Sequence, residues 1–399
     1  MKVNRTLKSV RASPTVTIAN EARQLIAAGR KIIDLTEGQP DFDTPEFIVE
    51  AAYRAALDGQ TRYTAVAGTA ELRQAISRKF RVDNGFDCEV DNVVVGNGGK
   101  QLIFNAMMVS LDAGDEVLVP APYWVSYPDI VKLAGGVPVI VPTSPESGFR
   151  VTAAALRERV GERTRWLLLN SPCNPTGTVL EARDLEDIAE FLRAHPKISV
   201  MCDDIYEKIV FDGRRFSTMA QVAPDLGQRI LTVNGVSKSH AMTGWRIGYA
   251  AGPRAFVAAM IKFQGQSTTN ASSVSQAAAL AALTGPGEYM DEWCEAYERK
   301  RDLVSELLSA SGLLRPHVPQ GAFYSFVDCR RLIGCRLADG TAVSDDADIA
   351  GQFLKLAGVA VIPGSAFGCP GFVRLCFAKE DRRLRDACLG MLDVVDRLT

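Results

Sequence analysis

Short apolar runs alternate with helical patterns along the middle of the chain. The runs are rich in Val, Ile and Leu and are bounded by Gly, Pro or Asp, and helical patterns such as 102–111, 153–160 and 182–195 lie between most of them. Continuous apolar strands that alternate with helices are typical of a buried, mostly parallel sheet. The sequence therefore predicts an α/β fold. The predicted strands are 93–95, 116–119, 137–141, 166–169, 199–202, 230–233 and 247–250.

The alternation weakens after about residue 282. Helical patterns at 303–310 and 384–398, with strand patterns at 322–327 and 359–362, indicate a second, smaller α+β domain. A length of 399 residues is enough for two or three domains. We expect an N-terminal arm with part of the small domain over 1–44, a large domain over 45–284 and the small domain over 285–399.

The first forty or so residues are polar and irregular apart from a helical stretch near 18–28. Turn residues predict a loop over 38–45. A helix is expected to begin at Pro45-Glu46, with Pro45 at the first helical position and Thr44 as its N-cap.

Charge and cysteine usage limit the partners and the compartment that we expect. The chain carries 45 Lys and Arg residues against 47 Asp and Glu residues, a net charge of −2, which offers no electrostatic footprint for nucleic acid or an anionic membrane. Its longest Ala/Leu run, 277–283, is far shorter than the roughly 20 residues that cross a bilayer. Nine cysteines without a Cys-x-x-Cys pair predict reduced thiols in the cytoplasm, and three histidines without ligand spacing predict no metal site.

A polar segment, 237–246, directly follows the predicted strand 230–233. A shielded lysine in a loop at a sheet edge, here Lys238, can act as a Schiff-base nucleophile. Arg246 can bind a phosphate with its forked donors. The alternative is that both side chains are solvated at the surface, which is the commoner fate of such a pair.

Three further segments also follow predicted strands. In Cys202-Asp203-Asp204 the aspartates can bind a metal, or one can hold a protonated ring nitrogen, or one can cap the next helix. Asn174, in the loop 170–177, can donate a hydrogen bond to a ligand oxygen or belong to a plain loop. Glycines at 96–99 precede a helix and can cradle a phosphate, although their spacing matches neither a Walker loop nor a dinucleotide fingerprint.

All four segments lie at the edge of the sheet where open α/β folds bind ligands. Together they supply a phosphate cradle, a carboxylate, an amide, a lysine and an arginine. Pyridoxal 5'-phosphate requires this combination of groups. The sequence therefore predicts pyridoxal phosphate as the cofactor.

With these motifs the chain resembles the class I pyridoxal-phosphate aminotransferases of fold type I, from about Ser13 to Arg374. The most specific stretches are 170–177, 203–206 and 237–248. Within the family the chain is most similar to the bacterial aspartate and aspartate/prephenate aminotransferases, through 37–45, 98–101 and 122–127. The resemblance implies a large domain with a mostly parallel sheet, a smaller α+β domain, and amino-group transfer from aspartate, or another dicarboxylic or aromatic amino acid, to a 2-oxo acid such as 2-oxoglutarate.

The resemblance also implies roles at the cofactor. Lys238 would hold it as a Schiff base and later move a proton, while Asp203 would pair with the pyridinium nitrogen. The triplet Cys202-Asp203-Asp204 departs from the family's more usual Ser-Asp-Glu, but it keeps this partner. The other implied cofactor residues are Tyr206 and Asn174 at the phenolic oxygen, Trp124 stacked on the ring, Gly98, Gly99, Lys100, Ser237 and Arg246 around the phosphate, and Tyr63 from the partner subunit of a homodimer.

At the substrate, the resemblance implies that Arg374 clamps the α-carboxylate, helped by the backbone N–H of Gly38, with Trp124 and Asn174 beside it. Many aspartate aminotransferases take a second arginine from the partner subunit, but the matching stretch 264–273 contains none. In the more similar subgroup, Thr15 and Lys100 would bind the distal carboxylate instead. Lys100 has a competing role, since it can simply balance the phosphate charge.

Other functions remain open at this point. Another fold type I enzyme, such as a β-lyase or a decarboxylase, or an aminotransferase for a different side chain, can use the same cofactor groups. A transcription regulator with an aminotransferase-like domain would need a DNA-binding extension of several dozen residues, whereas the resemblance begins by Ser13.

Overall fold

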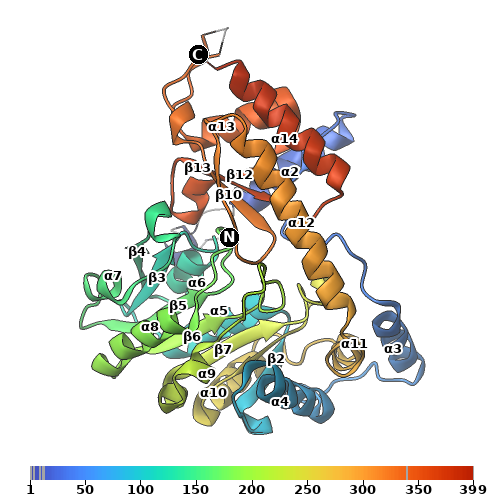
Figure 1. Cartoon of the computed structure of the whole chain (residues 1–399). Helices are drawn as coiled ribbons and strands as arrows, with labels where there is room; N and C mark the ends of the chain where they lie inside the picture. The colour runs from blue at the N-terminus through green and yellow to red at the C-terminus, as the bar shows by residue number, and fades with distance from the viewer. Residues whose placement is uncertain (1, 3–4, 9, 11–13, 338–339, 399) are drawn as a thin grey trace.

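The computed structural model describes residues 2, 5–8, 10, 14–337 and 340–398. Two main sheets organise these residues, a seven-stranded sheet in the lower half of Figure 1 and a four-stranded sheet in the upper half. The long helix α12 (Tyr289–Ser309) runs from one half to the other. The predicted α/β fold is confirmed.

All seven predicted strands form the large sheet. They are β2 (Val93–Gly96), β3 (Glu116–Ala121), β4 (Val137–Pro142), β5 (Thr164–Asn170), β6 (Ser199–Asp203), β7 (Ile230–Gly235) and β8 (Gly248–Ala251). Their order is β2-β8-β7-β6-β5-β3-β4, and β8 is antiparallel to both of its neighbours. The pairs from β7 across to β4 are parallel. The carboxyl ends of β5, β6 and β7 therefore meet at one edge of the sheet.

Helices cover both faces of this sheet, which explains why its strands are apolar without alternation. These helices are α3 (Glu46–Leu57), α4 (Ala70–Asn84), α5 (Gly99–Ser110), α6 (Tyr127–Leu133), α7 (Ala153–Arg157), α8 (Ala182–Ala194), α9 (Met219–Val222), α10 (Arg254–Gly265) and α11 (Ser273–Thr284). On one face Val94 and Leu168 pack against α5, α6 and α10. On the other face Val93 and Tyr249 pack against α3, α4 and α11, and Leu167 packs with residues of α7, α8 and α9.

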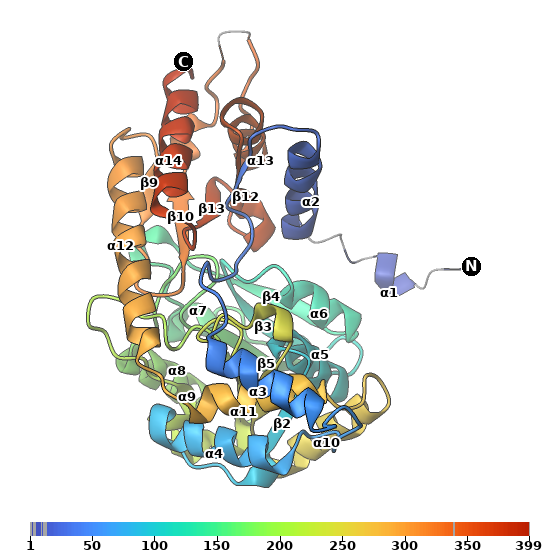
Figure 2. The same cartoon turned by 90° about the vertical axis from the view of Figure 1, so that its right-hand side faces the viewer.

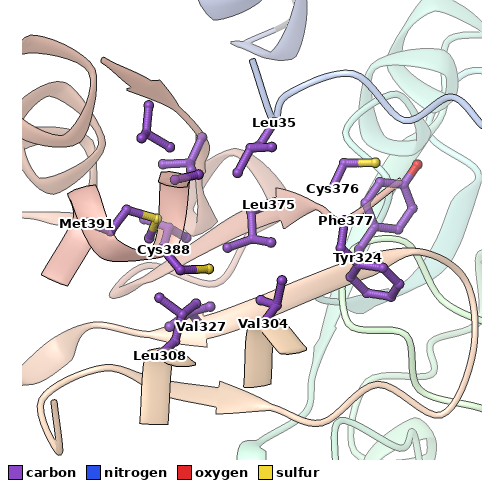
Figure 3. Packing of buried hydrophobic residues seen from close by; sticks show 14 of the residues in the cluster. Leu35, Val304, Leu308, Tyr324, Val327, Leu375, Cys376, Phe377, Cys388 and Met391 are labelled. Atoms are coloured by element: carbon purple, nitrogen blue, oxygen red, sulfur yellow. The ribbon is translucent and has the colours of Figure 1, made fainter. Parts of the chain in front are cut away.

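The second sheet is antiparallel and is built from the C-terminal part of the chain. Its strands are β9 (Arg315–His317), β10 (Tyr324–Asp328), β12 (Ile362–Pro363) and β13 (Phe372–Cys376), in the order β12-β13-β10-β9. Figure 3 shows its core, where Val304 and Leu308 of α12 meet Leu375 and Met391. Met391 belongs to α14 (Asp381–Asp396), so two long helices are held against this sheet.

The N-terminal segment packs with the C-terminal part of the chain. The short strand β1 (Ile33–Asp34) pairs in parallel with β11 (Val359–Ala360). Helix α2 (Pro14–Ala27) lies beside α13 (Asp346–Gln352), and the chain then descends to α3 at the large sheet (Figure 2). The short helix α1 (Arg5–Lys8) precedes α2. The domain bounds at residues 44 and 284 stay a prediction.

The predicted N-cap of α3 is wrong. Pro45 occupies the cap position, and no side chain caps the helix. The Thr44 hydroxyl instead donates a 2.7 Å hydrogen bond to the carbonyl of Ala241. This bond connects the predicted loop 38–45 to the segment that follows Lys238. The Thr44 hydroxyl thus donates to a distant carbonyl and does not accept a backbone N–H at the start of α3.

Within the described ranges, every helix is too short or too polar to span a lipid bilayer. Among the same residues, no group of three or more His, Cys, Asp or Glu side chains is arranged to hold a metal ion.

Candidate active site

A pocket of about 430 Å³ lies where the four segments meet, at the carboxyl ends of the central strands and the N-terminus of α5. Most of the predicted site residues line it. They are Gly38, Gly99, Lys100, Trp124, Asn174, Asp203, Tyr206, Ser237, Lys238, Arg246 and Arg374. The structure thus brings together residues that are up to 336 positions apart in the sequence, from Gly38 to Arg374.

Three predicted site residues do not line this pocket. Gly98 lies immediately behind it, since a Cβ atom there would be 2.5 Å from Nη2 of Arg246. Tyr63 is 90% exposed and makes no contribution to the pocket of its own chain. Thr15 belongs to α2, but its side chain lies outside the described part of the structure.

Lys238 follows β7 and points its amine into the pocket. Its Nζ atom donates a 2.5 Å hydrogen bond to the carbonyl of Gly38. Burial, which disfavours the charged form, lowers the pKa of Lys238 to about 8. About a tenth of the amine is therefore uncharged at pH 7, and this is the form that can act as a nucleophile or accept a proton.

Asp203 ends β6 and carries the buried carboxylate of the site. Burial raises its pKa to about 6, opposed by hydrogen bonds from Tyr127 and from the backbone of Ile205, and by the charge of Lys238. The end of the neighbouring strand β5 is bonded to Asp203, because Asn170 Nδ2 donates to the backbone carbonyl of Asp203 at 2.8 Å. Asn170 Oδ1 in turn accepts the backbone N–H of Asn174 at 2.8 Å and so holds that loop in place.

Asp204 does not share the pocket with Asp203, so the two aspartates do not form a paired metal site there. Its carboxylate accepts a 2.7 Å hydrogen bond from the Thr218 hydroxyl and does not line the pocket. Burial raises the pKa of Asp204 well above its usual range. The two adjacent aspartates therefore point to different surroundings, as successive residues at the end of a strand do.

One end of the pocket, the predicted phosphate end, combines a helix N-terminus with a guanidinium. Gly98, with φ of 83°, precedes the first residue of α5, Gly99. The unpaired N–H groups of a first helical turn attract anions. Arg246 is fixed beside them by hydrogen bonds from Nη1 to the Thr243 carbonyl at 2.9 Å and from Nη2 to the Asn97 carbonyl at 3.3 Å.

Lys100 lies between this predicted phosphate end and the ring of Trp124. Its Nζ atom is 4.8 Å from the centre of the Trp124 ring, within the range of a cation–π interaction. Burial and the nearby Arg246 both lower the pKa of Lys100. The structure is compatible with either of the two roles expected for this lysine.

Arg374 lies on β13, a strand that the sequence analysis did not predict, and it is almost completely buried. Its Nη1 atom donates to Oδ1 of Asn174 at 3.1 Å, and Nη2 donates to the carbonyl of Thr36. Its Nε atom is buried and has no hydrogen-bond partner among the described residues. An unsatisfied buried donor of this kind is costly unless a ligand supplies the acceptor.

Two tyrosines at the site were missed by the sequence analysis. Tyr324 shares a 2.7 Å hydrogen bond with Tyr206 and has its ring 4.6 Å from the guanidinium of Arg374. Tyr127 donates to Asp203 from outside the pocket lining. Tyr127 stands in the stretch 122–127, which carried part of the resemblance, but only a tertiary contact gives it a role.

The position of Gly38 explains why a glycine stands there. A Cβ atom at Gly38 would lie 1.9 Å from the hydroxyl of Tyr324, far inside van der Waals contact. Only a residue without a side chain lets this backbone approach the tyrosine and Lys238 together.

Comparisons with known proteins agree with this geometry. The family model for aminotransferase class I and II matches residues 30–389. An aspartate/prephenate aminotransferase of Cereibacter sphaeroides is 48% identical over 384 residues, which cover 96% of this chain and 96% of the relative. A probable aspartate/prephenate aminotransferase of Rickettsia felis is 46% identical over 383 residues, which cover 96% of this chain and 94% of the relative.

Solved structures give the same result. The aspartate aminotransferase from Rhizobium meliloti matches with a TM-score of 0.97 and 45% identity over 100% of both chains. The aspartate aminotransferase from Thermus thermophilus with maleate matches with a TM-score of 0.93 and 40% identity, covering 99% of this chain and 100% of the other. The chain therefore belongs to the class I and II aminotransferases, which transfer an amino group between an amino acid and a 2-oxo acid.

Proposed function

We propose that this chain uses pyridoxal phosphate, bound at Lys238, to transfer the amino group of aspartate, or of another dicarboxylic or aromatic amino acid, to a 2-oxo acid such as 2-oxoglutarate. The observation that carries the proposal is one pocket that holds both a partly buried lysine, Lys238, with a pKa of about 8 and a buried arginine, Arg374, with a free Nε donor. A lysine nucleophile and a carboxylate receptor are the two groups that an amino-acid substrate requires.

The residues present suit pyridoxal phosphate. The N-terminus of α5, Arg246 and Ser237 would hold its phosphate, since each can offer hydrogen-bond donors to an anion. Asp203 would hold a protonated ring nitrogen, and Trp124 would stack on the ring. When bound, the cofactor supplies an electron sink beside the Cα atom of the substrate.

The chain's own side chains would then perform three tasks. Lys238 Nζ would take the proton from the substrate Cα atom and deliver it to the C4′ atom of the cofactor, which its pKa of about 8 allows near neutral pH. Arg374, through its free Nε and the second hydrogen of Nη2, would bind the α-carboxylate in bidentate fashion. Tyr206, whose pKa is raised by burial and by Tyr324, stays protonated and would donate a hydrogen bond to an oxyanion.

The substrate side chain is assigned on the relatives and on Lys100. Two relatives are named aspartate/prephenate aminotransferases, and the Thermus thermophilus enzyme is described with maleate, a dicarboxylate. Lys100 supplies a cation in the pocket that can meet a distal carboxylate. We propose Thr15 as its companion, as the resemblance implies.

We also propose a homodimer. The phenol ring of Tyr63 is 90% exposed in a single chain, although tyrosine rings are apolar and are seldom so exposed. A partner subunit would cover it and bring it to the neighbouring cofactor. The cytoplasmic location rests on the cysteine pattern and stays a prediction.

A panel of amino donors and acceptors tests the proposed function. Aspartate, glutamate, phenylalanine and alanine are each paired with 2-oxoglutarate, oxaloacetate and prephenate, and both products are measured. We expect stoichiometric transfer with the highest kcat/KM for a dicarboxylic donor. Release of ammonia with pyruvate, or of carbon dioxide, without amination of the 2-oxo acid would instead identify a β-lyase or a decarboxylase.

A further inference from the structure

The N-terminal segment forms one wall of the active-site pocket. Helix α2 contributes Ala19 and Arg23 to the lining, and the loop after β1 contributes Glu37 and Gln39. Of the described residues that line the pocket, two carry a carboxylate, Glu37 and Asp203. Asp203 lies at the bottom with the proposed cofactor groups, whereas Glu37 directly precedes Gly38 on the wall where the substrate would enter.

Arg23 and Glu37 attract each other without a hydrogen bond. Arg23 Nη2 lies 3.9 Å from Glu37 Oε1, and the arginine side chain is 59% exposed. Arg23 Nε donates to the carbonyl of Ala19 in its own helix at 3.2 Å, while Glu37 Oε2 accepts from Gln39 Nε2 at 3.2 Å. Among the described residues the two Nη groups of Arg23 therefore have no hydrogen-bond acceptor.

A ligand can easily replace Glu37 as the partner of Arg23. Exposed ion pairs beyond hydrogen-bond distance contribute little stability, whereas a guanidinium binds a planar carboxylate strongly when both Nη groups can donate. A ligand carboxylate that reaches the mouth of the pocket would offer Arg23 the two acceptors that Glu37 does not. A ligand without a second carboxylate would leave the existing pair undisturbed.

We propose that Arg23 binds the distal carboxylate of a dicarboxylic substrate in exchange for Glu37, and that Glu37 opposes this binding by like-charge repulsion. The inference rests on the proposed function, because it assumes amino-group transfer from dicarboxylic substrates. It adds Arg23, on the N-terminal wall of the pocket, as a second cation beside Lys100 for the distal carboxylate. Lys100 lies with Arg246 at the phosphate end, whereas Arg23 makes no contact with the proposed cofactor groups and its removal should leave the cofactor site intact.

Two charge-neutral variants of the holoenzyme test the exchange, because their effects have opposite signs. Arg23→Gln should lower kcat/KM for aspartate and 2-oxoglutarate by about tenfold, mainly through a higher KM, since one hydrogen-bonded charge contact is lost. Phenylalanine should change by less than about twofold. Glu37→Gln should raise kcat/KM for the dicarboxylates, and Arg23→Lys should recover part of the loss.

A binding measurement and a matched control complete the test. Calorimetric titration with maleate and with crotonate, which lacks the second carboxylate, should show weaker binding of maleate alone in Arg23→Gln. The control is Arg54→Gln, which removes another exposed helical arginine, 71% exposed and paired with Glu50, outside the pocket. It should leave all constants unchanged.

The outcomes separate this inference from the function on which it rests. Equal losses for mono- and dicarboxylic ligands in Arg23→Gln, or no loss for either, would overturn the role of Arg23 while leaving the proposed function intact. A wild-type enzyme that transfers no amino group to or from a dicarboxylic acid would refute both.

Discussion

The hydroxyl of Tyr127 donates a 2.6 Å hydrogen bond to Oδ2 of Asp203. Tyr127 begins α6 and Asp203 ends β6, and both side chains are buried. Burial raises the pKa of Asp203 to about 6, and the bond from Tyr127 is the largest of the effects that hold it down. A tyrosine outside the pocket lining thus helps to keep ionised the carboxylate that we propose for the pyridinium nitrogen.

Replacing Tyr127 by Phe should shift the pH dependence of cofactor binding. Loss of a hydrogen bond to a charged group is worth roughly 1.5–3 kcal/mol, or about 1–2 pKa units, and it raises the pKa of Asp203 further. Because the ionised Asp203 carboxylate would bind the cofactor, the affinity for pyridoxal phosphate should be high above the pKa of Asp203. It should fall as the pH drops through that pKa. In Tyr127→Phe this fall should begin at a higher pH.

The measurement is the dissociation constant of pyridoxal phosphate from pH 5 to pH 8, with Tyr53→Phe as the control. Tyr53 is an exposed tyrosine of α3. Identical pH profiles for wild type and Tyr127→Phe would contradict the assignment.

The proposed homodimer makes Tyr63 a residue of the neighbouring site. Tyr63→Phe should weaken cofactor retention, because a hydrogen bond to the phosphate is lost, while the dimer itself persists. Sedimentation together with the absorbance of retained cofactor after gel filtration measures both properties. A monomer that is fully active at assay concentration would contradict the proposed homodimer.

Lys100→Ala distinguishes the two roles of that lysine. If it binds a distal carboxylate, the loss of a charged hydrogen bond of roughly 1.5–3 kcal/mol should lower kcat/KM for dicarboxylic substrates by about 10- to 150-fold. Phenylalanine and alanine should be much less affected. An equal loss for both substrate classes would place Lys100 at the cofactor phosphate and leave the distal carboxylate to other residues.

A buried ion pair outside the pocket should contribute to the free energy of unfolding. Lys79 forms an ion pair with Glu207, and their side chains are 5% and 6% exposed. Asn84 completes the cluster by accepting from Lys79 and donating to Glu207. Lys79→Met leaves an uncompensated buried carboxylate, so the free energy of unfolding should fall by about 3–5 kcal/mol.

Urea unfolding of the apoenzyme measures this change. Arg54→Met, which breaks the exposed Arg54–Glu50 pair, should cost less than about 1 kcal/mol. Similar losses for the two variants would show that burial of the Lys79–Glu207 pair does not matter.

The sequence predicted the large sheet well because its buried strands are continuous apolar runs between turn residues. It did not predict β13, since Arg374 stands in the middle of that short strand and interrupts the apolar pattern. The pairings of Tyr127 with Asp203 and of Tyr206 with Tyr324 join residues 76 and 118 positions apart. No local pattern signals such contacts, and the same is true of the Thr44 hydroxyl, which bonds to Ala241 rather than to its own helix.

The most direct test of the account is to reduce the holoenzyme with borohydride and map the labelled peptide. We expect one pyridoxyl group per chain, on Lys238, because this amine, whose pKa is lowered to about 8, faces the pocket. Lys238→Ala should take up no label and show no amino-group transfer. Labelling of a different lysine, or transfer activity that survives Lys238→Ala, would contradict the account.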